Sequence, residues 1–356
     1  STQRRLNQLL PDETEITPEI VEELLGRAVS NVDADREVVK VAPGEFRVDS
    51  MEAENPVGTI GSSISADVGV ISCRQQMIRN ISLAISDKLG LRINGKVVRH
   101  VAIADMCLTS DERERGVMLV DFGAETTTVS IYKGGYLRSL VTLPLGSRHI
   151  TRDIMSRNFS EERAEEHKKA IGNAILQSPE AARMRNAGVD DSEINCYVAA
   201  RAGEIVVNIL ERVNEIGLTP HDLPAGIVLT GGGARLTNFD VLLSDQSGLD
   251  VRRATIPASV RRSSNKLQLP DHIDVVAVLH SLASQATREC VSVPAPSVET
   301  ANPPVADNSN DPDLVVENVS GRRSGRSLFS PFRKFVSEIL NPADDDDSEE
   351  DFTAEN

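Results

Sequence analysis

Two apolar segments that run into small residues dominate the hydrophobic pattern of this chain. In the first, residues 117–135 read VMLVDFGAETTTVSIYKGG: a β-branched-rich run ends at Asp121, and a turn of small and hydroxyl residues leads into a second apolar run. Such runs are typical of buried strands, and the Gly, Ala and Thr between them allow a backbone or a ligand to approach closely. The pattern predicts a β-hairpin, with a third strand over residues 137–144.

The turn of this hairpin carries groups that suit a phosphate. Its tip, residues 123–127, offers backbone N–H groups and hydroxyls to an anion, and the carboxylate of Asp121 can hold the water shell of a magnesium ion. An ordinary β-hairpin without a ligand explains the same residues equally well. A second segment shifts the balance between the two interpretations.

That segment, residues 226–236, reads GIVLTGGGARL. A second buried strand runs into Gly231, Gly232 and Gly233, and a helix is expected over residues 239–243. Glycines at the carboxyl end of a strand let a sugar or phosphate come close, and the following helix points its dipole at it. The segment is neither GxGxxG nor a P-loop. Two such glycine-bearing turns in one chain suggest the phosphate and adenosine loops of an actin-type ATPase.

The rest of the globular part is predicted as further helices and strands. Thr17 and Pro18 suit a helix start, and Gly90 suits the end of an amphipathic helix. Strands are expected over residues 37–48, 59–72 and 97–102. Helices are expected over residues 17–28, 75–89, 160–176, 197–214 and 271–288.

The last segments of the chain have a different pattern. Residues 291–326 are rich in Pro, Asn, Ser and Val without periodicity, which predicts a disordered linker. Residues 327–341 predict an amphipathic helix, in which Arg333 and Lys334 lie opposite the apolar side. The apolar side consists of Leu328, Phe329, Phe332, Phe335, Val336, Ile339 and Leu340. It can bind an anionic lipid surface or dock back on the protein; residues 342–356 then form an acidic tail.

Composition excludes several classes of function. The formal charge of −16 argues against nucleic acid, although eight acids in residues 343–356 supply half of it. Four cysteines without a CxxC argue against zinc and against a disulfide framework, and they favour a reducing cytosol. The six histidines show no metal-ligand spacing. No apolar run approaches the roughly 20 residues that span a bilayer.

Several stretches resemble the FtsA family of actin-like bacterial cell-division proteins. They are PDETEITPEIVEELL at residues 11–25, NPVG at 55–58, GIVLTGGGARLTNF at 226–239, and the long stretch LTSDERERGVMLVDFGAETTTVSIYKGGYLRSLVTLPLGSRHITRDI at 108–154. The resemblance runs in order from about residue 11 to 286. It implies an α/β, actin-like (ribonuclease H-like) ATPase fold with an inserted subdomain, followed by the disordered linker and the C-terminal amphipathic helix.

The resemblance also implies how the chain divides. The inserted subdomain is expected at 1–72, truncated at its start, and the remainder of the first actin-like domain at 73–116. No first phosphate loop precedes residue 117, so we expect a fragment that binds nucleotide more weakly than the full protein. The further divisions are the second actin-like domain at 117–270 with its outer subdomain at 160–224, a returning helix at 271–290, the linker at 291–326, the membrane-targeting helix at 327–341 and the tail at 342–356.

Carried over residue by residue, the resemblance implies a nucleotide site for ATP and Mg²⁺. Asp121 would organise the magnesium shell through water, while Glu165 would accept from the ribose hydroxyls and Lys168 would lie near the base on an exposed helix face. Read without the family, Glu165 and Lys168 form an ordinary solvent-face pair. The nucleotide-binding residues are then Asp121, Gly123, Ala124, Thr126, Thr127, Glu165, Lys168, Gly231, Gly232 and Gly233.

Two departures from the family pattern concern hydrolysis. Thr128 stands where many actin-like ATPases carry a second Asp, and Glu125 replaces a common Gly. We therefore expect an ATP-binding adaptor with at most weak ATPase activity, and no catalytic residue is assigned. The resemblance implies partners as well: the C-terminal peptide of FtsZ, a second copy in an actin-like polymer, anionic membrane lipid and other division proteins, and no nucleic acid.

The expected location is the cytoplasmic side of the inner membrane at the division septum, as a peripheral protein. There it would tie the FtsZ ring to the membrane through the helix at 327–341 and help to recruit later division proteins. Two other functions remain open. A pilus-assembly adaptor of the same fold would not need the tethered helix, and a sugar- or acetate-kinase-like enzyme should show a substrate acid or base in its cleft.

Overall fold

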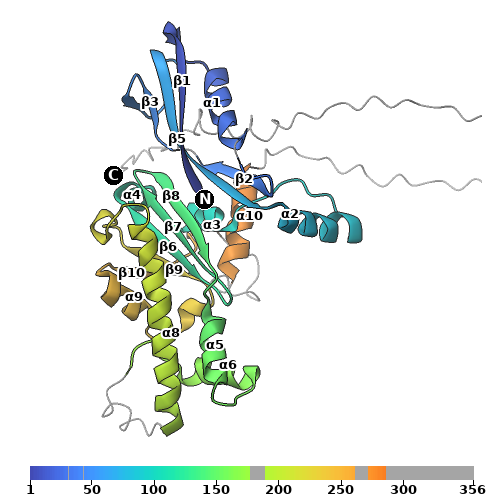
Figure 1. Cartoon of the computed structure of the whole chain (residues 1–356), viewed down its shortest axis with the longest axis vertical. Helices are drawn as coiled ribbons and strands as arrows, with labels where there is room; N and C mark the ends of the chain where they lie inside the picture. Colours follow the sequence, from blue (N-terminus) through green and yellow to red (C-terminus); the bar gives the residue numbers. More distant parts are fainter. Residues whose placement is uncertain (31, 43, 177–188, 261–271, 286–356) are drawn as a thin grey trace, which may run out of the picture.

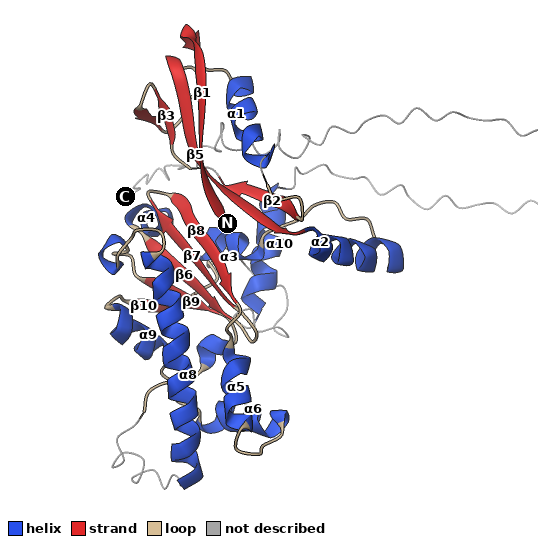
Figure 2. Cartoon of the chain, viewed as in Figure 1, coloured by secondary structure: helices blue, strands red, loops and turns tan. Residues whose placement is uncertain are grey.

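The computed structural model describes residues 1–30, 32–42, 44–176, 189–260 and 272–285. Within them the chain forms two five-stranded sheets, each covered by helices (Figures 1 and 2). Residues predicted to bind the membrane, namely Leu328, Phe329, Phe332, Arg333, Lys334, Phe335, Val336, Ile339 and Leu340, lie outside the described residues, as do the linker and the acidic tail. None of the described helices is long and apolar enough to cross a membrane.

The first sheet is built around one long strand. β5 (Ile60–Arg74) pairs antiparallel with β1 (Thr2–Glu15), β2 (Arg36–Ala42) and β3 (Phe46–Val48), and β3 pairs with β4 (Met51–Ala53). Helix α1 (Pro18–Ser30) buries Val21, Leu24, Leu25 and Ala28 in the core that it shares with this sheet. The predicted helix over 17–28 and strand over 59–72 are confirmed. The polar strand β1 was not predicted, and the strand expected over 37–48 is divided into β2 and β3.

Four helical segments connect the sheets. α2 (Gln75–Ser82) continues as a π-helix, η1 (Leu83–Lys88), which confirms a helix over most of 75–89, although none of its apolar residues is buried. The strand expected over residues 97–102 is wrong, because α3 (Arg99–Cys107) is helical there and α4 (Ser110–Arg115) follows. A short apolar run fits a buried helix as well as a strand, and α3 buries six of its nine residues.

The second sheet carries the predicted hairpin at its centre. Its order is β10 (Val251–Arg253), β9 (Ile227–Thr230), β6 (Val117–Phe122), β7 (Thr127–Lys133) and β8 (Tyr136–Leu143). β6 and β7 are antiparallel and fully confirm the hairpin, whereas β6 and β9 run parallel. Every residue of β6 is buried, as expected of a strand covered on both faces.

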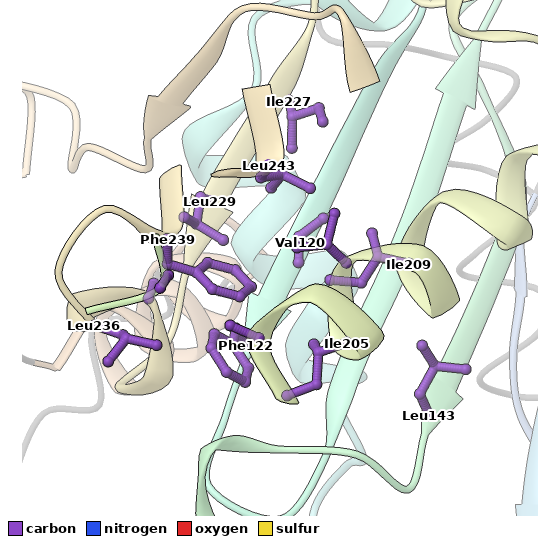
Figure 3. Packing of buried hydrophobic residues seen from close by; sticks show 14 of the residues in the cluster. Val120, Phe122, Leu143, Ile205, Ile209, Ile227, Leu229, Leu236, Phe239 and Leu243 are labelled. Carbon is purple, nitrogen blue, oxygen red and sulfur yellow. The ribbon is translucent and has the colours of Figure 1, made fainter. Parts of the chain in front are cut away.

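Side chains alternate between the two faces of this sheet. Met118, Val120 and Phe122 pack with α5 (Ser147–Met155), α6 (Glu161–Ile171), α8 (Val189–Asn214) and α9 (Phe239–Ser247), and Figure 3 shows part of this core. Phe122 stacks on Phe239 with ring centroids 4.4 Å apart. Leu119 packs on the opposite face, against α3 and α10 (Ile273–Gln285). Asp121 shares the alternation of Leu119, which turns its side chain toward α3 and α10.

The two sheets meet along strand β8. Gln3 donates to the carbonyls of Leu137 (2.9 Å) and Arg138 (2.6 Å), and the guanidinium of Arg138 pairs with Glu45. β5 continues to Arg74, two residues beyond the division expected at residue 72. The first sheet therefore stands at the edge of the second, on the side away from β9 and β10 (Figure 1).

Candidate functional site

The two glycine turns lie next to each other at the carboxyl ends of β6 and β9. These strands are parallel neighbours in which Asp121 is opposite Thr230, so the turns that follow them leave the second sheet on the same side. Gly231 has φ of +95°, and a Cβ there would stand 2.3 Å from the Phe122 carbonyl oxygen and 2.6 Å from Asp121 Oδ1. Only glycine fits a backbone this close to the neighbouring strand end.

The phosphate turn is braced against the start of α5. Gly123 N–H donates to the Thr126 carbonyl (2.9 Å), and Thr127 Oγ1 donates to the Leu145 carbonyl (2.6 Å). The N–H of Arg148 donates to the Ala124 carbonyl (2.8 Å). A Cβ at Gly146 would lie 2.3 Å from the same carbonyl oxygen. The hydroxyl of Thr128, at the position where a second Asp is common, is buried and bonded to Thr142 Oγ1 at 3.0 Å.

A cleft of about 650 Å³ opens between this turn, α5 and α6. Three of the predicted nucleotide-binding residues line it: Ala124 from the turn, and Glu165 and Lys168 from α6. Its other lining residues are Ser147, Arg148, Ser160, Glu161 and Glu162. Sequence reasoning missed Ser147 and Arg148, although they follow the third strand directly within the stretch LPLGSRHIT. The remaining predicted residues are not among those that line this cleft.

Lys168 is buried, which makes the expectation of an exposed helix residue wrong. Its side chain is 8% exposed, and its ammonium donates to the Ser147 carbonyl (3.1 Å) and to Thr151 Oγ1 (2.9 Å) and lies 2.6 Å from Glu165 Oε2. These contacts join α6 to α5. Lys168 therefore holds the wall of the cleft together and orients Glu165.

Glu165 is the acid of the cleft wall that Lys168 and Thr151 orient. Its Oε2 accepts from Thr151 Oγ1 at 2.6 Å, and its side chain remains one-third exposed. Partial burial raises the pKa of Glu165, but the hydrogen bonds from Lys168 and Thr151 and the charges of Lys168 and Lys169 outweigh it, so the pKa lies below its usual range. Glu165 is thus a charged hydrogen-bond acceptor at neutral pH.

An asparagine network fixes α6 to the second glycine turn. Asn195 Oδ1 accepts from the N–H of Asn173 (2.7 Å), Asn238 Nδ2 donates to Asn173 Oδ1 (3.0 Å), and Ala174 N–H donates to the Thr237 carbonyl (2.9 Å). The loop after α6 thereby lies against the loop that follows Gly231–Gly233. These hydrogen bonds connect the helix that carries Glu165 and Lys168 to the second glycine turn.

Charged pairs cross the mouth of the cleft. Arg148 donates to Glu125 (2.8 Å) and to Glu161 (2.6 Å), and Arg152 lies 3.4 Å from Glu125. The hydrogen bond from Arg148 lowers the pKa of Glu125. These side chains are about half exposed, and pairs of this kind exchange partners at little cost.

Asp121 already has cationic partners. Its side chain is 9% exposed, and Oδ2 accepts from Arg99 Nη2 at 2.7 Å and lies 3.2 Å from His100 Nε2. Among the described residues, no group of three His, Cys, Asp or Glu side chains is placed to hold a metal ion. The site as it stands therefore does not fit a magnesium ion held at Asp121, because Arg99 compensates the carboxylate charge.

The fold and this site define a class. The structure is an α/β protein of the actin-like ATPase fold, in which a β-hairpin and a strand–glycine–helix unit share one sheet, and it carries an inserted subdomain. The family model "Cell division protein FtsA" matches residues 118–277, and the model "SHS2 domain inserted in FTSA" matches residues 3–72. The chain belongs to the FtsA family of cell division proteins.

Individual relatives agree with this assignment. The chain is 30% identical to the cell division protein FtsA of Porphyromonas gingivalis over 79% of its own length and 60% of that protein. It is 28% identical to FtsA of Escherichia coli over 79% of its length and 70% of that protein. It thus spans about 60–70% of the length of these two relatives.

Among solved structures, the "PilM-PilN type IV pilus biogenesis complex" aligns with 79% of the chain and 76% of that chain. The TM-score is 0.48 and the sequence identity 18%. A likeness at this level says nothing of function.

Proposed function

We propose that this protein is an ATP-binding adaptor of cell division that links the FtsZ ring to the cytoplasmic face of the inner membrane. One observation carries the nucleotide part: within a member of the FtsA family, Ala124 of the phosphate turn and the Glu165–Lys168 pair line one cleft, and the glycine turn follows the strand next to the phosphate turn. Its volume of about 650 Å³ lies within the 300–1,000 Å³ that is usual for small-molecule sites.

Each part of the cleft has a task that its chemistry suits. Glu165 would accept hydrogen bonds from the ribose hydroxyls, since Thr151 and Lys168 hold its carboxylate charged and oriented. Gly231 does not line the cleft, but it lets the second glycine turn pack closely against the end of β6 beside the phosphate turn. Arg148 is the exposed cation of the cleft wall, and a phosphate could take the place of Glu125 or Glu161 as its partner.

We further propose that hydrolysis is at most weak, so that the protein is an adaptor more than an enzyme. Thr128 offers a hydroxyl that is buried and bonded to Thr142, not a carboxylate that could orient an attacking water. Glu125 adds a negative charge to the turn that is meant to approach phosphates. Asp121 could hold the water shell of a magnesium ion only after its ion pair with Arg99 is broken.

The partners follow from the family and the chain's own sequence. FtsA-family membership supports other division proteins, the C-terminal peptide of FtsZ and a second copy of the chain as partners. The helix expected at 327–341 supports binding to anionic lipid, because its apolar side carries three phenylalanines and arginines precede it.

Co-sedimentation with anionic vesicles tests the adaptor role. The chain should pellet with the vesicles and carry FtsZ with it. Burying Phe335 in lipid is worth about 1.5–3 kcal/mol, so Phe335→Asp should lower vesicle binding at least tenfold (about 1.4 kcal/mol). Ser337→Asp adds the same charge on the polar side of the helix and is the matched control. If both variants bind vesicles like the parent, the helix is not the anchor and the adaptor proposal fails.

A further inference from the structure

Arg99 lies between two carboxylates that come from different elements. It is the first residue of α3, and its guanidinium lies 2.7 Å from Asp121 Oδ2 at the end of β6 and 3.6 Å from Asp274 Oδ2 near the start of α10. Asp121 is nearly buried, whereas Asp274 and Arg99 are about two-fifths exposed. The cluster is therefore open to solvent on one side and closed by the sheet on the other.

Without Arg99, the two carboxylates would form a pair of the kind that binds a hydrated divalent cation. Magnesium is commonly held by one or two carboxylates and keeps several waters, and Asp121 and Asp274 would supply such a pair. A guanidinium between them neutralises the buried carboxylate and repels an incoming dication at short range. His100 Nε2, at 3.2 Å from the same Asp121 oxygen, adds a second nitrogen partner on that side.

We propose that Arg99 is a built-in counter-ion that takes the place of a divalent metal between Asp121 and Asp274. The parent chain then binds nucleotide with little dependence on Mg²⁺, and removal of the guanidinium opens a Mg²⁺ site. The first statement rests on the proposed nucleotide binding; the second does not. An ion pair that only fastens α3 to the sheet would give no such metal response.

Thermal unfolding in MgCl₂, with NaCl of equal ionic strength as reference, tests the metal site without nucleotide. The parent should show no response specific to Mg²⁺. Arg99→Met keeps the apolar stem but removes the charge, so it should melt lower and regain about 3 °C or more at a Mg²⁺ concentration well above its Kd. Asp121→Asn added to Arg99→Met should abolish that gain. Arg113→Met, which loses a pair with Asp105 elsewhere, is the control and should gain nothing.

Arg99→Gln serves if Arg99→Met does not fold, because the amide keeps a hydrogen bond to Asp121 without the charge. The proposal is overturned if Mg²⁺ does not raise the melting temperature of the folded Arg99 variants. It is also overturned if Mg²⁺ raises the melting temperature of the parent as much as that of the variants. Titration with ATP in EDTA and in Mg²⁺ is the second arm: the parent's affinity should change less than threefold, and that of Arg99→Met at least tenfold. If no variant binds ATP, the proposed function fails, while the melting experiment still decides this proposal.

Discussion

The role of Lys168 in the structure differs from the role that the sequence predicts. The spacing Glu165-x-x-Lys168 fits a solvent-face pair, but α5 packs over this side of α6 and buries the lysine. A buried ammonium is stable only with acceptors around it, and here the Ser147 carbonyl, Thr151 and Glu165 provide them. Helical periodicity cannot reveal which neighbour will cover a polar face, and so the burial of Lys168 could not be predicted.

Lys168→Ala should therefore destabilise the protein. The change removes the Lys168 donor from the Ser147 carbonyl and from Glu165, which keeps only Thr151 as a hydrogen-bond donor, and losing these contacts in a largely buried site costs about 1–3 kcal/mol. Lys169→Ala, at the exposed neighbouring position, should change the free energy of unfolding by less than about 0.5 kcal/mol. Denaturant melts of the two variants check this. Equal stability of both would show that the Lys168 contacts contribute nothing.

At the scale of elements, the predictions succeeded where a pattern was long or had clear end signals. α1 begins at Pro18 after Thr17, and the hairpin β6–β7 follows its apolar runs residue by residue. They failed at α3, whose apolar run is too short to distinguish a helix from a strand, and at β1, whose polar residues pair with β5 by tertiary contacts alone.

α4 offers a test of element stability against pH. Glu112 completes the capping box with Thr109 and accepts from Arg252 of β10, 140 residues away. Partial burial raises the pKa of Glu112, but the hydrogen bonds from Thr109 and Arg252 and the charge of Arg252 outweigh it and hold the pKa below its usual range. A carboxyl group whose pKa is lower in the folded than in the unfolded state stabilises the fold at any pH above its unfolded-state pKa. That stabilisation is lost as the pH falls through the folded-state pKa. Stability should therefore drop below about pH 4.5.

Glu112→Gln should reduce this loss of stability at acid pH (the acid limb of the stability curve), because glutamine does not titrate. It should also lower the free energy of unfolding at pH 7. Glu114→Gln, on the exposed side of the same helix, should leave the acid limb unchanged. Urea melts from pH 3 to pH 7 compare the three proteins. An acid limb that is as steep in Glu112→Gln as in the parent would show that other carboxylates are responsible.

At the scale of the whole molecule, the sequence predicts which turns meet but not what completes the site. The two glycine turns follow strands that are parallel neighbours, so their convergence follows from the fold class. Arg99, Asp274 and Asn195 reach the site from helices far away in the sequence, and no local pattern marks them. The charge of the molecule is also uneven, since residues 343–356 hold eight acids.

Removal of the acidic tail should strengthen membrane binding. A chain cut after Asn341 loses eight acids that repel an anionic surface, so its affinity for anionic vesicles should rise, and most at low salt where screening is weak. Vesicle titrations at two salt concentrations measure the effect. An unchanged affinity would mean that the tail does not face the lipid surface.

ATP binding at the cleft is the central claim, and calorimetric titration of ATP into the parent, Glu165→Gln and Glu166→Gln tests it most directly. Glu165 is held charged toward the cleft, whereas Glu166 is exposed on α6 and does not line it. Loss of one charge-assisted hydrogen bond costs about 1.5 kcal/mol or more, so Glu165→Gln should bind ATP at least tenfold more weakly. Glu166→Gln should bind ATP like the parent. A folded parent that does not bind ATP, or a Glu165→Gln variant with the parent's affinity, would contradict the account.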